Sequence, residues 1–549
     1  MKKQLLDRSL NIFILFLVLI IGASARFYNL NLMPLNLDEH CDTIQGTELI
    51  KRGNVDKFLN IPISIYKGKI PLLFNFFSLV TSRFFIDPVL IARIPSVLFG
   101  TLTIFLVYLL GRILYGDRVG LFSSLFLAFL PWHIIMSRIG LKIIMVPFFG
   151  VFIFYLLYSG VELNNRALFL LSFFALGVGA FYTYPSALIF IPIFMAALFL
   201  LKNRKFHIDF KLILTGIFLF LIPIFPMLAL SGRANFLGSQ SYHSFFNNID
   251  INGANFFQLF YNNFILNIRT IFQLLFFCNF PPMGLFAPSM GYPLLLSKAF
   301  FILFLVLAIY AFCKHKASDL IMLTWVTLGI LLTALIVKDG IQPRYLFVIL
   351  PAPLILIAAF LKEKLISSKI KFLKISAYII LVLVVSHAIR IYFDYHRTAP
   401  KDKEEWMVNS AGSKEAAEYL FKDNLSRNYT VVADFRMTVS AYLSYYIKLF
   451  KSKKEIFGDI HKHFYEMPGL YCLKRDELEK IEKEGAGEHK TIYYFLWSGQ
   501  THNKKGDWRD YFTLLRENFK ALHPDIEPIR RIYYPDGSAA IEIFKIVAG

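Results

Sequence analysis

The sequence has little cysteine and none of several short patterns that mark soluble enzymes. Its four cysteines, Cys41, Cys278, Cys313 and Cys472, lie far apart, and no CxxC pair occurs. This spacing argues against a disulfide framework and against a zinc site. The sequence also contains no GxSxG, HExxH or GxxxxGKS/T pattern, so hydrolase, metalloprotease and P-loop functions have no support.

Charge is scarce and one-sided. Charged residues make up 17% of the chain, with 38 Asp and Glu against 58 Lys and Arg, for a net charge of +20. In a soluble protein this excess would suggest nucleic acid, but the sequence has neither an RNA-binding aromatic signature nor zinc-finger spacing. The basic residues instead concentrate in short loops between apolar segments. We therefore interpret them as a signal of membrane topology, and we expect no nucleic-acid partner.

Long apolar runs are what the sequence has in abundance. Hydrophobic residues account for 56% of the chain, 59 of its residues are Phe, and the mean hydropathy is +0.54. A helix needs about 20 apolar residues to cross the hydrocarbon core of a bilayer. The first run has no convincing cleavage site, so we expect it to be kept as a span. The sequence predicts eleven spanning helices, near residues 9–26, 89–111, 119–137, 140–158, 167–184, 185–201, 212–230, 294–313, 319–337, 345–361 and 375–391.

The distribution of Lys and Arg predicts the sidedness of these spans. With a cytoplasmic N-terminus, the inside stretches hold 17 Lys and Arg in 50 residues, whereas loop 231–293 holds only Arg233 and Arg269 in 63 residues. Positive residues favour the cytoplasmic side. We therefore expect a multi-pass protein of the cell (inner) membrane, with everything after Arg390 outside the cytoplasm.

Two further segments are apolar but interrupted by polar groups. They are residues 70–86 and 255–280. We interpret both as amphipathic helices that lie at the outer membrane interface. If only one of them crossed the membrane, every downstream segment would lie on the opposite side.

The composition changes near residue 392, where charged residues become frequent. SKEAAEYLFKDNL is typical of a surface helix, and YTVVADF and TIYYFLW are typical of strands. RIYYPDGSAAIEIFKI predicts a hairpin around a Pro-Asp-Gly turn. The fold class expected is therefore a polytopic α-helical membrane domain, residues 1–391, followed by an extracytoplasmic soluble α/β domain, residues 392–549.

Ionisable residues at the expected outer face are candidates for chemistry. Asp38 and Glu39 follow the first span by 11–13 residues, with Asp42 close behind. Neighbouring carboxylates can act as a general base or bind a metal. From the pair alone, a solvated acidic loop or an N-cap at Asp38 is the simpler interpretation.

Cations also gather at this expected face. Arg93 lies near the start of a span, and His133, Arg138 and Lys142 surround the next outer turn. A charge in such a place is costly unless it pairs or meets water. Anchoring to lipid headgroups is the common alternative.

Several segments together resemble a known superfamily. They are LDE in the first outer loop, GKIPL, ARIPSVLFGTLT, GDRVGLFSSLFLAFLPWHIIMSR, ALGVGAFYTYPSALIFIP and QPRYLFVILPAPLILIAAF, in that order. Over roughly residues 1–395 the chain resembles the GT-C superfamily of membrane glycosyltransferases. The resemblance is close to the protein-mannosyltransferase and aminoarabinose-transferase-like group. Each segment is weakly specific alone, and their order and spacing carry the resemblance.

The resemblance implies a reaction and a set of site residues. Such enzymes move a sugar from a polyprenyl-phosphate carrier to a lipid, glycan or protein acceptor at the outer face. It implies Asp38 as the catalytic base with Glu39 supporting it, because the family's catalytic acid lies in the first outer loop. The leaving phosphate needs cations, for which Lys69 and Arg344 rank first and Arg93 and Arg138 second. No cofactor is expected, and a divalent metal is left open.

The chain also departs from the superfamily pattern. Many relatives carry a second acid between the third and fourth spans, where this sequence reads SRIGLKIIMVP, without Asp or Glu. The WWD signature of oligosaccharyltransferases is absent, which argues against transfer of whole glycans to Asn. Two alternatives stay open: a polytopic lipid or sugar transporter or flippase, and a non-catalytic relative. Transporters place ionisable groups near the bilayer midplane in repeated halves, and no repeat is visible here.

Overall fold

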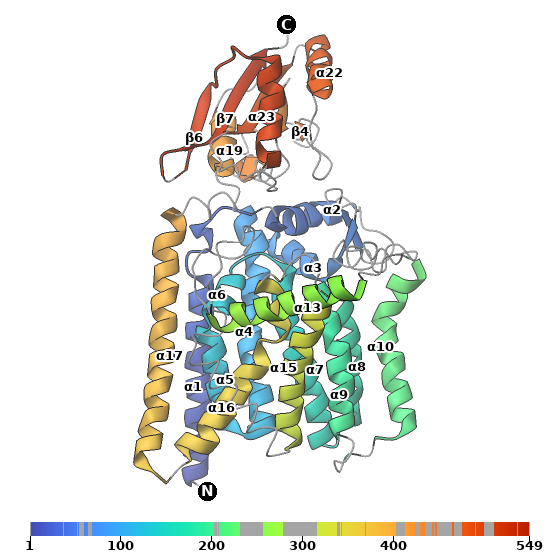
Figure 1. The fold of residues 1–549 in the computed structure, drawn as a ribbon, viewed down its shortest axis with the longest axis vertical. Coiled ribbons are helices and arrows are strands. Elements are labelled where there is room, and N and C mark those ends of the chain that lie inside the picture. The colour runs from blue at the N-terminus through green and yellow to red at the C-terminus, as the bar shows by residue number, and fades with distance from the viewer. Residues whose placement is uncertain are drawn as a thin grey trace.

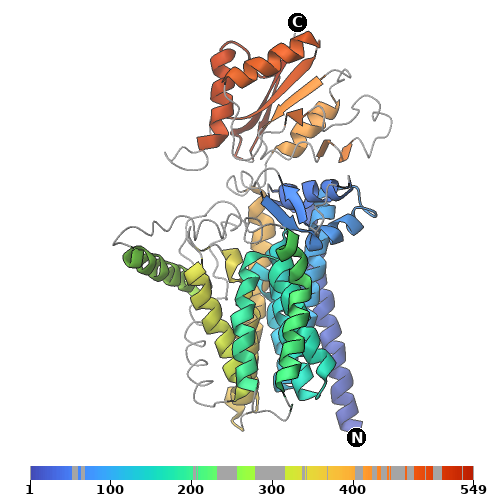
Figure 2. The ribbon, with the colours of Figure 1, turned by 90° about the vertical axis from the view of Figure 1, so that its right-hand side faces the viewer.

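The chain folds into a helical bundle with a sheet domain at one end (Figure 1). The computed structural model describes residues 2–53, 60–63, 68–201, 206–230, 256–277, 316–336, 341–401, 412–422, 429–433, 442–446, 464–465, 475–498 and 510–547, apart from isolated positions within these ranges. The N-terminus lies at the end of the bundle opposite the sheet domain (Figures 1 and 2).

The bundle is built from apolar helices. Its described members are α1 (Lys2–Phe27), α4 (Pro88–Tyr115), α5 (Asp117–Phe129), α6 (Pro131–Met136), α7 (Met145–Glu162), α8 (Arg166–Tyr182), α9 (Phe190–Leu201), α10 (Phe210–Leu230), α15 (Ala317–Ile336), α16 (Pro351–Phe360) and α17 (Lys371–Thr398). The central helix is α7, which is buried along most of its length, whereas α1 and α17 expose large apolar side chains along theirs. Such all-round apolar helices are suited to lipid, and the chain is a polytopic membrane protein.

The predicted spans correspond to described helices in most places. Within the described residues, five helices are long and apolar enough to cross a membrane. They match the predictions at 9–26, 89–111, 140–158, 319–337 and 375–391. Shorter apolar helices occupy the predicted spans at 167–184, 185–201 and 212–230. The span predicted at 294–313 lies outside the described residues, so the total of eleven stays a prediction.

Two predicted spans are interrupted by proline. The segment 119–137 is not one helix, because α5 ends at Phe129 and α6 begins at Pro131. Proline lacks the N–H that would continue the helix, and it drives the residue before it out of the helical region. Leu130 accordingly has an extended backbone, with φ −70° and ψ 113°. Likewise 345–361 divides into η6 (Pro343–Val348), a 3-10 helix, and α16, which starts at Pro351.

The break between α5 and α6 is filled by a buried arginine. Arg26 of α1 is fully buried and donates to the carbonyl oxygens of Leu127 and Ala128, each at 3.2 Å. These carbonyls belong to the last turn of α5, where the helix supplies no further donors; the Leu127 carbonyl also accepts from Leu130 N at 3.3 Å. The same guanidinium donates to Ser137 Oγ at 3.3 Å and to Nδ1 of His133 at 2.7 Å. Arg26 therefore ties α1 to both sides of the break.

The amphipathic segment 255–280 contains α13 (Phe256–Phe272), which lies across the bundle rather than along it (Figures 1 and 2). Its inner side contacts α15, where Asn267 donates to the Ala334 carbonyl at 3.0 Å. Its outer side exposes Tyr261 and Leu266. This orientation agrees with an interfacial helix. The other amphipathic segment, 70–86, contains α3 (Leu72–Thr81), which packs on α4.

The C-terminal residues form a mixed sheet. Within the described residues its order is β4 (Phe464–Tyr465), β3 (Tyr429–Ala433), β5 (Thr491–Trp497), β7 (Ala539–Val547) and β6 (Arg530–Tyr533). The first three strands are parallel, and β7 runs antiparallel to both β5 and β6. Helices α22 (Arg475–Gly487) and α23 (Asp510–Leu522) contribute to one apolar core, and α19 (Ser413–Lys422) contributes to another.

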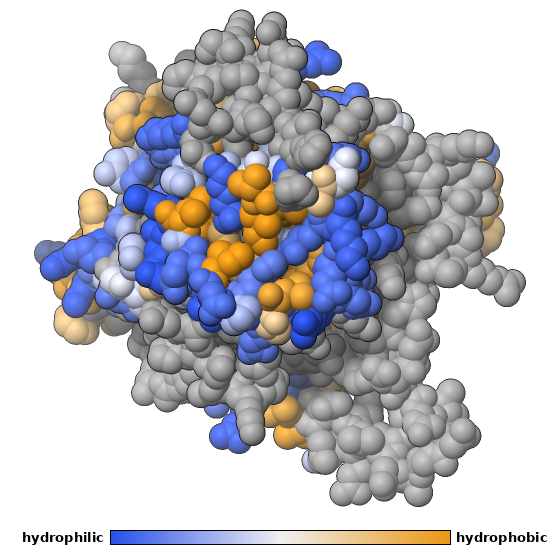
Figure 3. Space-filling view, turned by 90° about the horizontal axis from the view of Figure 1, so that it is seen from above, coloured by the Kyte–Doolittle hydropathy of each residue, from blue (hydrophilic) through white to orange (hydrophobic). Residues whose placement is uncertain are grey.

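The secondary structure predicted for this domain is confirmed. The predicted surface helix is α19, the two predicted strands are β3 and β5, and the hairpin is β6–β7. At its turn Gly537 adopts φ 82°, and Ser538 N donates to Asp536 Oδ1 at 2.9 Å. Seen from above (Figure 3), the described part of this end of the molecule is mainly hydrophilic, with a group of apolar residues near its centre. This surface is typical of a domain in water, and the domain boundary at 391/392 stays a prediction.

Candidate active site

The first loop after α1 is closed by a reciprocal capping arrangement. Asn36 Oδ1 accepts from Glu39 N at 2.8 Å, and Glu39 Oε2 accepts from Asn36 N at 3.0 Å. His40 N donates to the Asn36 carbonyl at 3.0 Å, as in the first turn of a helix. Asn36 is thus the residue that caps η2 (Glu39–Gln45), a π-helix, in the manner of a capping box.

This arrangement answers whether Asp38 caps the helix. Among the described residues, the Asp38 side chain makes no capping hydrogen bond to η2. The capping interpretation of Asp38 is therefore wrong, because Asn36 occupies that role. Asp38 stands two residues after the cap, where an acidic side chain is favoured by the helix dipole.

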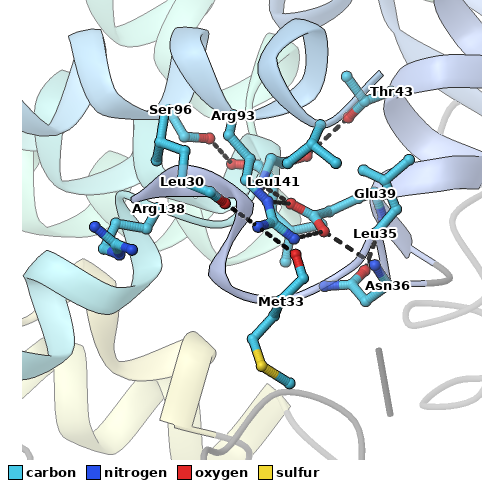
Figure 4. A network of polar contacts seen from close by, with 12 residues as sticks. Leu30, Met33, Leu35, Asn36, Glu39, Thr43, Arg93, Ser96, Arg138 and Leu141 are labelled. Carbon is cyan, nitrogen blue, oxygen red and sulfur yellow. Dashed lines mark hydrogen bonds and ion pairs between the residues drawn. The ribbon is translucent and has the colours of Figure 1, made fainter. Parts of the chain in front are cut away.

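Glu39 is fully buried and surrounded by donors (Figure 4). Its Oε1 accepts from Arg93 Nε at 2.8 Å and from Gly140 N at 2.6 Å. Its Oε2 accepts from Arg93 Nη2 at 2.8 Å in addition to Asn36 N. A bidentate pair with a satisfied carboxylate is the arrangement in which a buried ion pair is tolerated. Glu39 therefore joins the first loop to α4 and to the loop before η3 (Lys142–Ile144).

Gly140 shows how closely these segments approach. A Cβ at this position would lie 2.6 Å from the Ala92 carbonyl oxygen of α4, so the backbone contact requires glycine. Thr43 Oγ1 donates to the Gly140 carbonyl at 2.7 Å. Both backbone polar groups of Gly140 are therefore bound by η2 side chains.

Arg93 and Arg138 hold backbone carbonyls near the end of α1. Besides Glu39, Arg93 donates to the carbonyl oxygens of Leu30, Met33 and Pro34, at 2.5, 2.9 and 2.8 Å. Arg138 donates to the carbonyl oxygens of Ala25, Arg26, Tyr28 and Asn29. Both side chains are at most 5% exposed. Their observed hydrogen-bond partners are groups of the protein itself, and their phosphate-binding roles stay predictions.

Asp38 meets a cation from a distant part of the chain. Its Oδ2 accepts from Arg344 Nη1 of η6 at 3.2 Å, across 306 residues of sequence. The two side chains are 18% and 16% exposed, so unlike Glu39 and Arg93 they are reachable from solvent. The structure therefore brings together two of the predicted site residues in an accessible place.

Aromatic rings adjoin the Asp38–Arg344 pair. The guanidinium of Arg344 lies 5.6 Å from the ring centre of Tyr345. Tyr345 in turn stacks on Tyr184, with ring centres 6.3 Å apart. Tyr184 precedes η4 (Pro185–Ile189), which packs against η6, as η3 does. From the sequence alone Tyr184 is typical of an interfacial belt, and nothing in its spacing indicated Arg344 as a neighbour.

Lys69 lies in β2 (Gly68–Pro71), where its backbone pairs with Pro62 of β1 (Asn60–Ile63). Its side chain lies outside the described part of the structure, and its role stays a prediction. Among the described residues, no three His, Cys, Asp or Glu side chains gather as metal ligands.

One segment of the sequence and the fold of nearly the whole chain are similar to those of known proteins. Residues 69–229 match the family described as dolichyl-phosphate-mannose-protein mannosyltransferase. No curated protein matches by sequence. The fold is similar to that of ArnT from Cupriavidus metallidurans in the apo state, with a TM-score of 0.58 and 11% identity. The match covers 99% of this chain and 98% of that one.

Two ligand-bound structures are also similar. ArnT from Cupriavidus metallidurans bound to undecaprenyl phosphate has a TM-score of 0.55, 12% identity and 98% coverage of both chains. The oligosaccharyltransferase AglB from Archaeoglobus fulgidus, in complex with an inhibitory peptide and a dolichol-phosphate, has a TM-score of 0.55 and 12% identity. That match covers 97% of this chain and 74% of AglB.

Proposed function

From the match of residues 69–229 to the mannosyltransferase family and the similarity of the fold to ArnT, we propose that the chain is a membrane glycosyltransferase of the GT-C superfamily, close to the protein mannosyltransferases and the ArnT-like enzymes, and dependent on polyprenyl phosphate. It transfers a sugar from a polyprenyl-phosphate-linked donor to a lipid, glycan or protein acceptor. The transfer takes place at the end of the bundle that carries the sheet domain, which the Lys and Arg distribution assigns to the extracytoplasmic side.

The proposed chemistry assigns one role to each member of the accessible pair. The Asp38 carboxylate takes the proton from an acceptor hydroxyl, whose oxygen forms a bond to the anomeric carbon of the sugar. The bond from that carbon to the phosphate oxygen breaks, and its electron pair leaves with the polyprenyl phosphate. Arg344, with Lys69 as second candidate, stabilises the negative charge that develops on the phosphate.

The observation that carries this proposal is that the neighbouring acids Asp38 and Glu39 differ in exposure and in hydrogen-bond partners. Glu39 is fully buried, and both of its carboxylate oxygens accept hydrogen bonds from Arg93 or from Gly140 N. Asp38 is part-exposed and lies beside Arg344. A base and a phosphate-binding cation must both be reached by substrates, and this pair meets the requirement.

Donor binding tests the assignment of Arg344. Removing its charge, in Arg344→Ala, should weaken binding of undecaprenyl phosphate by about 1.5–3 kcal/mol, the contribution of a charged hydrogen bond. Lys69→Ala tests the second cation in the same way. Binding to purified protein in nanodiscs, by calorimetry or by competition with a labelled lipid, gives the measurement.

Arg112→Ala provides the matched control. Arg112 lies near the end of α4 away from Arg93, is 46% exposed and pairs with Asp117. Its binding should equal that of the wild type. Unchanged affinity in both Arg344→Ala and Lys69→Ala would reject the phosphate site. Headgroup anchoring would instead lower stability without an effect on the lipid.

A further inference from the structure

The sheet domain contacts the first loop through one apolar cluster. Leu35 is completely buried in it, together with Val89 and Ala92 of α4. From the sheet domain the cluster includes Tyr442 and Leu443, along with side chains of α19, β3, β5, β6 and β7. The loop that leads to Asp38 is therefore part of the sheet domain's own core.

Within this cluster one hydrogen bond joins the two parts. Leu35 N donates to Tyr442 Oη at 2.8 Å, and both groups are buried. Burial raises the pKa of the Tyr442 phenol above that of an exposed tyrosine. A buried backbone N–H needs a partner, and Tyr442 supplies it from a position 407 residues away.

The residues on either side of Leu35 are held in place by hydrogen bonds that lead to the bundle. Arg93 binds the carbonyls of Met33 and Pro34, and the capping pair of Asn36 and Glu39 follows directly. Leu35 is thus the point at which the sheet domain, by accepting the backbone N–H, helps to fix the chain just before Asp38.

We propose that Tyr442 is a positioning residue for Asp38: its hydroxyl holds the Leu35 N–H, and the sheet domain thereby sets the placement of the carboxylate beside Arg344. The proposal rests on the proposed function, because it assigns the purpose of that placement to sugar transfer. Tyr442 touches neither substrate in this scheme. It acts by keeping the start of η2 in one position, and a displacement of about 1 Å can lower a rate by two orders of magnitude.

Tyr442→Phe removes the acceptor and keeps the ring. The Leu35 N–H then lacks a partner, which favours local opening by about tenfold or more. Amide exchange of the full-length protein in nanodiscs should therefore become faster in peptides from residues 30–45, and unchanged in peptides from α7. Turnover per donor-binding site should fall about tenfold, while affinity for undecaprenyl phosphate should stay within about twofold, because Arg344 is held by η6.

Tyr446→Phe is the matched control. Tyr446 lies four residues later and stacks on Phe421 at 5.8 Å, and the substitution removes the same atom. It should leave both exchange in residues 30–45 and turnover as in the wild type. A purely structural role for Tyr442 would reduce the number of donor-binding sites and leave turnover per site unchanged.

Turnover is measured as release of undecaprenyl phosphate from undecaprenyl-phosphate mannose, in host membranes that contain the native acceptor. Faster exchange with reduced turnover per site supports the proposal. Unchanged exchange in residues 30–45, an equal change in Tyr446→Phe, or unchanged turnover per site overturns it. A wild-type protein that releases no lipid contradicts the proposed function for this donor, and the exchange comparison then still decides whether Tyr442 orders the loop.

Discussion

Asp38 and Glu39 are adjacent acids with different environments. Glu39 points into a buried network with Arg93, Asn36 and Gly140, while Asp38 stands beside Arg344 with part of its surface open. The difference arises because successive residues of a helix point in different directions around its axis. One residue of the pair can therefore hold the fold while its neighbour faces substrates.

Asp38→Asn should abolish most turnover and leave the fold intact. Asn keeps the shape of the side chain but cannot take a proton, and loss of general-base help costs about 10²–10⁴-fold in rate. Folding and undecaprenyl phosphate affinity should be retained, since Arg344 is still present. Single-turnover measurements with a confirmed donor and acceptor provide the check, and near-normal turnover would move the search for the base to another acid.

Glu39→Gln, unlike Asp38→Asn, should lower the stability of the fold. It leaves Arg93 buried without its charged partner, and breaking a buried ion pair in this way costs about 3–5 kcal/mol. The apparent melting temperature in detergent should therefore fall well below that of Asp38→Asn. Equal melting temperatures for the two variants would mean that the Glu39–Arg93 pair does not hold the first loop.

The sequence indicated these residues but not their pairing. LDE and the segment that contains Arg344 could be recognised from motif order, because each motif is local. That Glu39 binds Arg93 while Asp38 meets Arg344 depends on how α4 and η6 pack against the first loop, across 54 and 306 residues. No periodicity within one segment contains that information. Tyr442 and Arg26 were missed for the same reason.

Among the elements, α5 and α6 show where the bundle depends on a single side chain. Proline at 131 could have indicated the break from the sequence alone, whereas the partner that fills it could not be identified. Arg26 donates to the Ala128 carbonyl oxygen and adds a second donor to that of Leu127, in an apolar interior where an unpaired polar group costs several kcal/mol. The break is therefore tolerated because α1 carries a cation at that depth.

Arg26→Met should destabilise the bundle by about 3 kcal/mol or more, because the thioether side chain of Met cannot donate the two or more charged hydrogen bonds that Arg26 makes. Arg26→Lys should destabilise it less, since an ammonium group can still donate to one or two of the carbonyls. Thermal unfolding in detergent compares the three proteins. A Met variant as stable as the wild type would contradict the account of the break.

For the whole molecule, the sequence predicted the described long helices and the sheet domain, because apolar length and periodicity are local patterns. The side of the membrane on which each loop lies is a separate prediction, which depends on the Lys and Arg content of the loops. Reporter fusions at Lys314 and after Arg397 should give opposite sidedness, cytoplasmic for the first and extracytoplasmic for the second. The same sidedness for both fusions would contradict the arrangement of eleven spans.

The hydrogen bond between Leu35 and Tyr442 also has a consequence for biosynthesis. Leu35 and Tyr442 are 407 positions apart, so at about 5–20 residues per second the ribosome needs roughly 20–80 s to go from one to the other. During this interval the first loop has already emerged, yet its partner does not exist. We therefore expect a nascent or prematurely terminated chain to be inactive toward the lipid-linked sugars around it, so that the reaction begins only when the last part of the protein has been translated and folded.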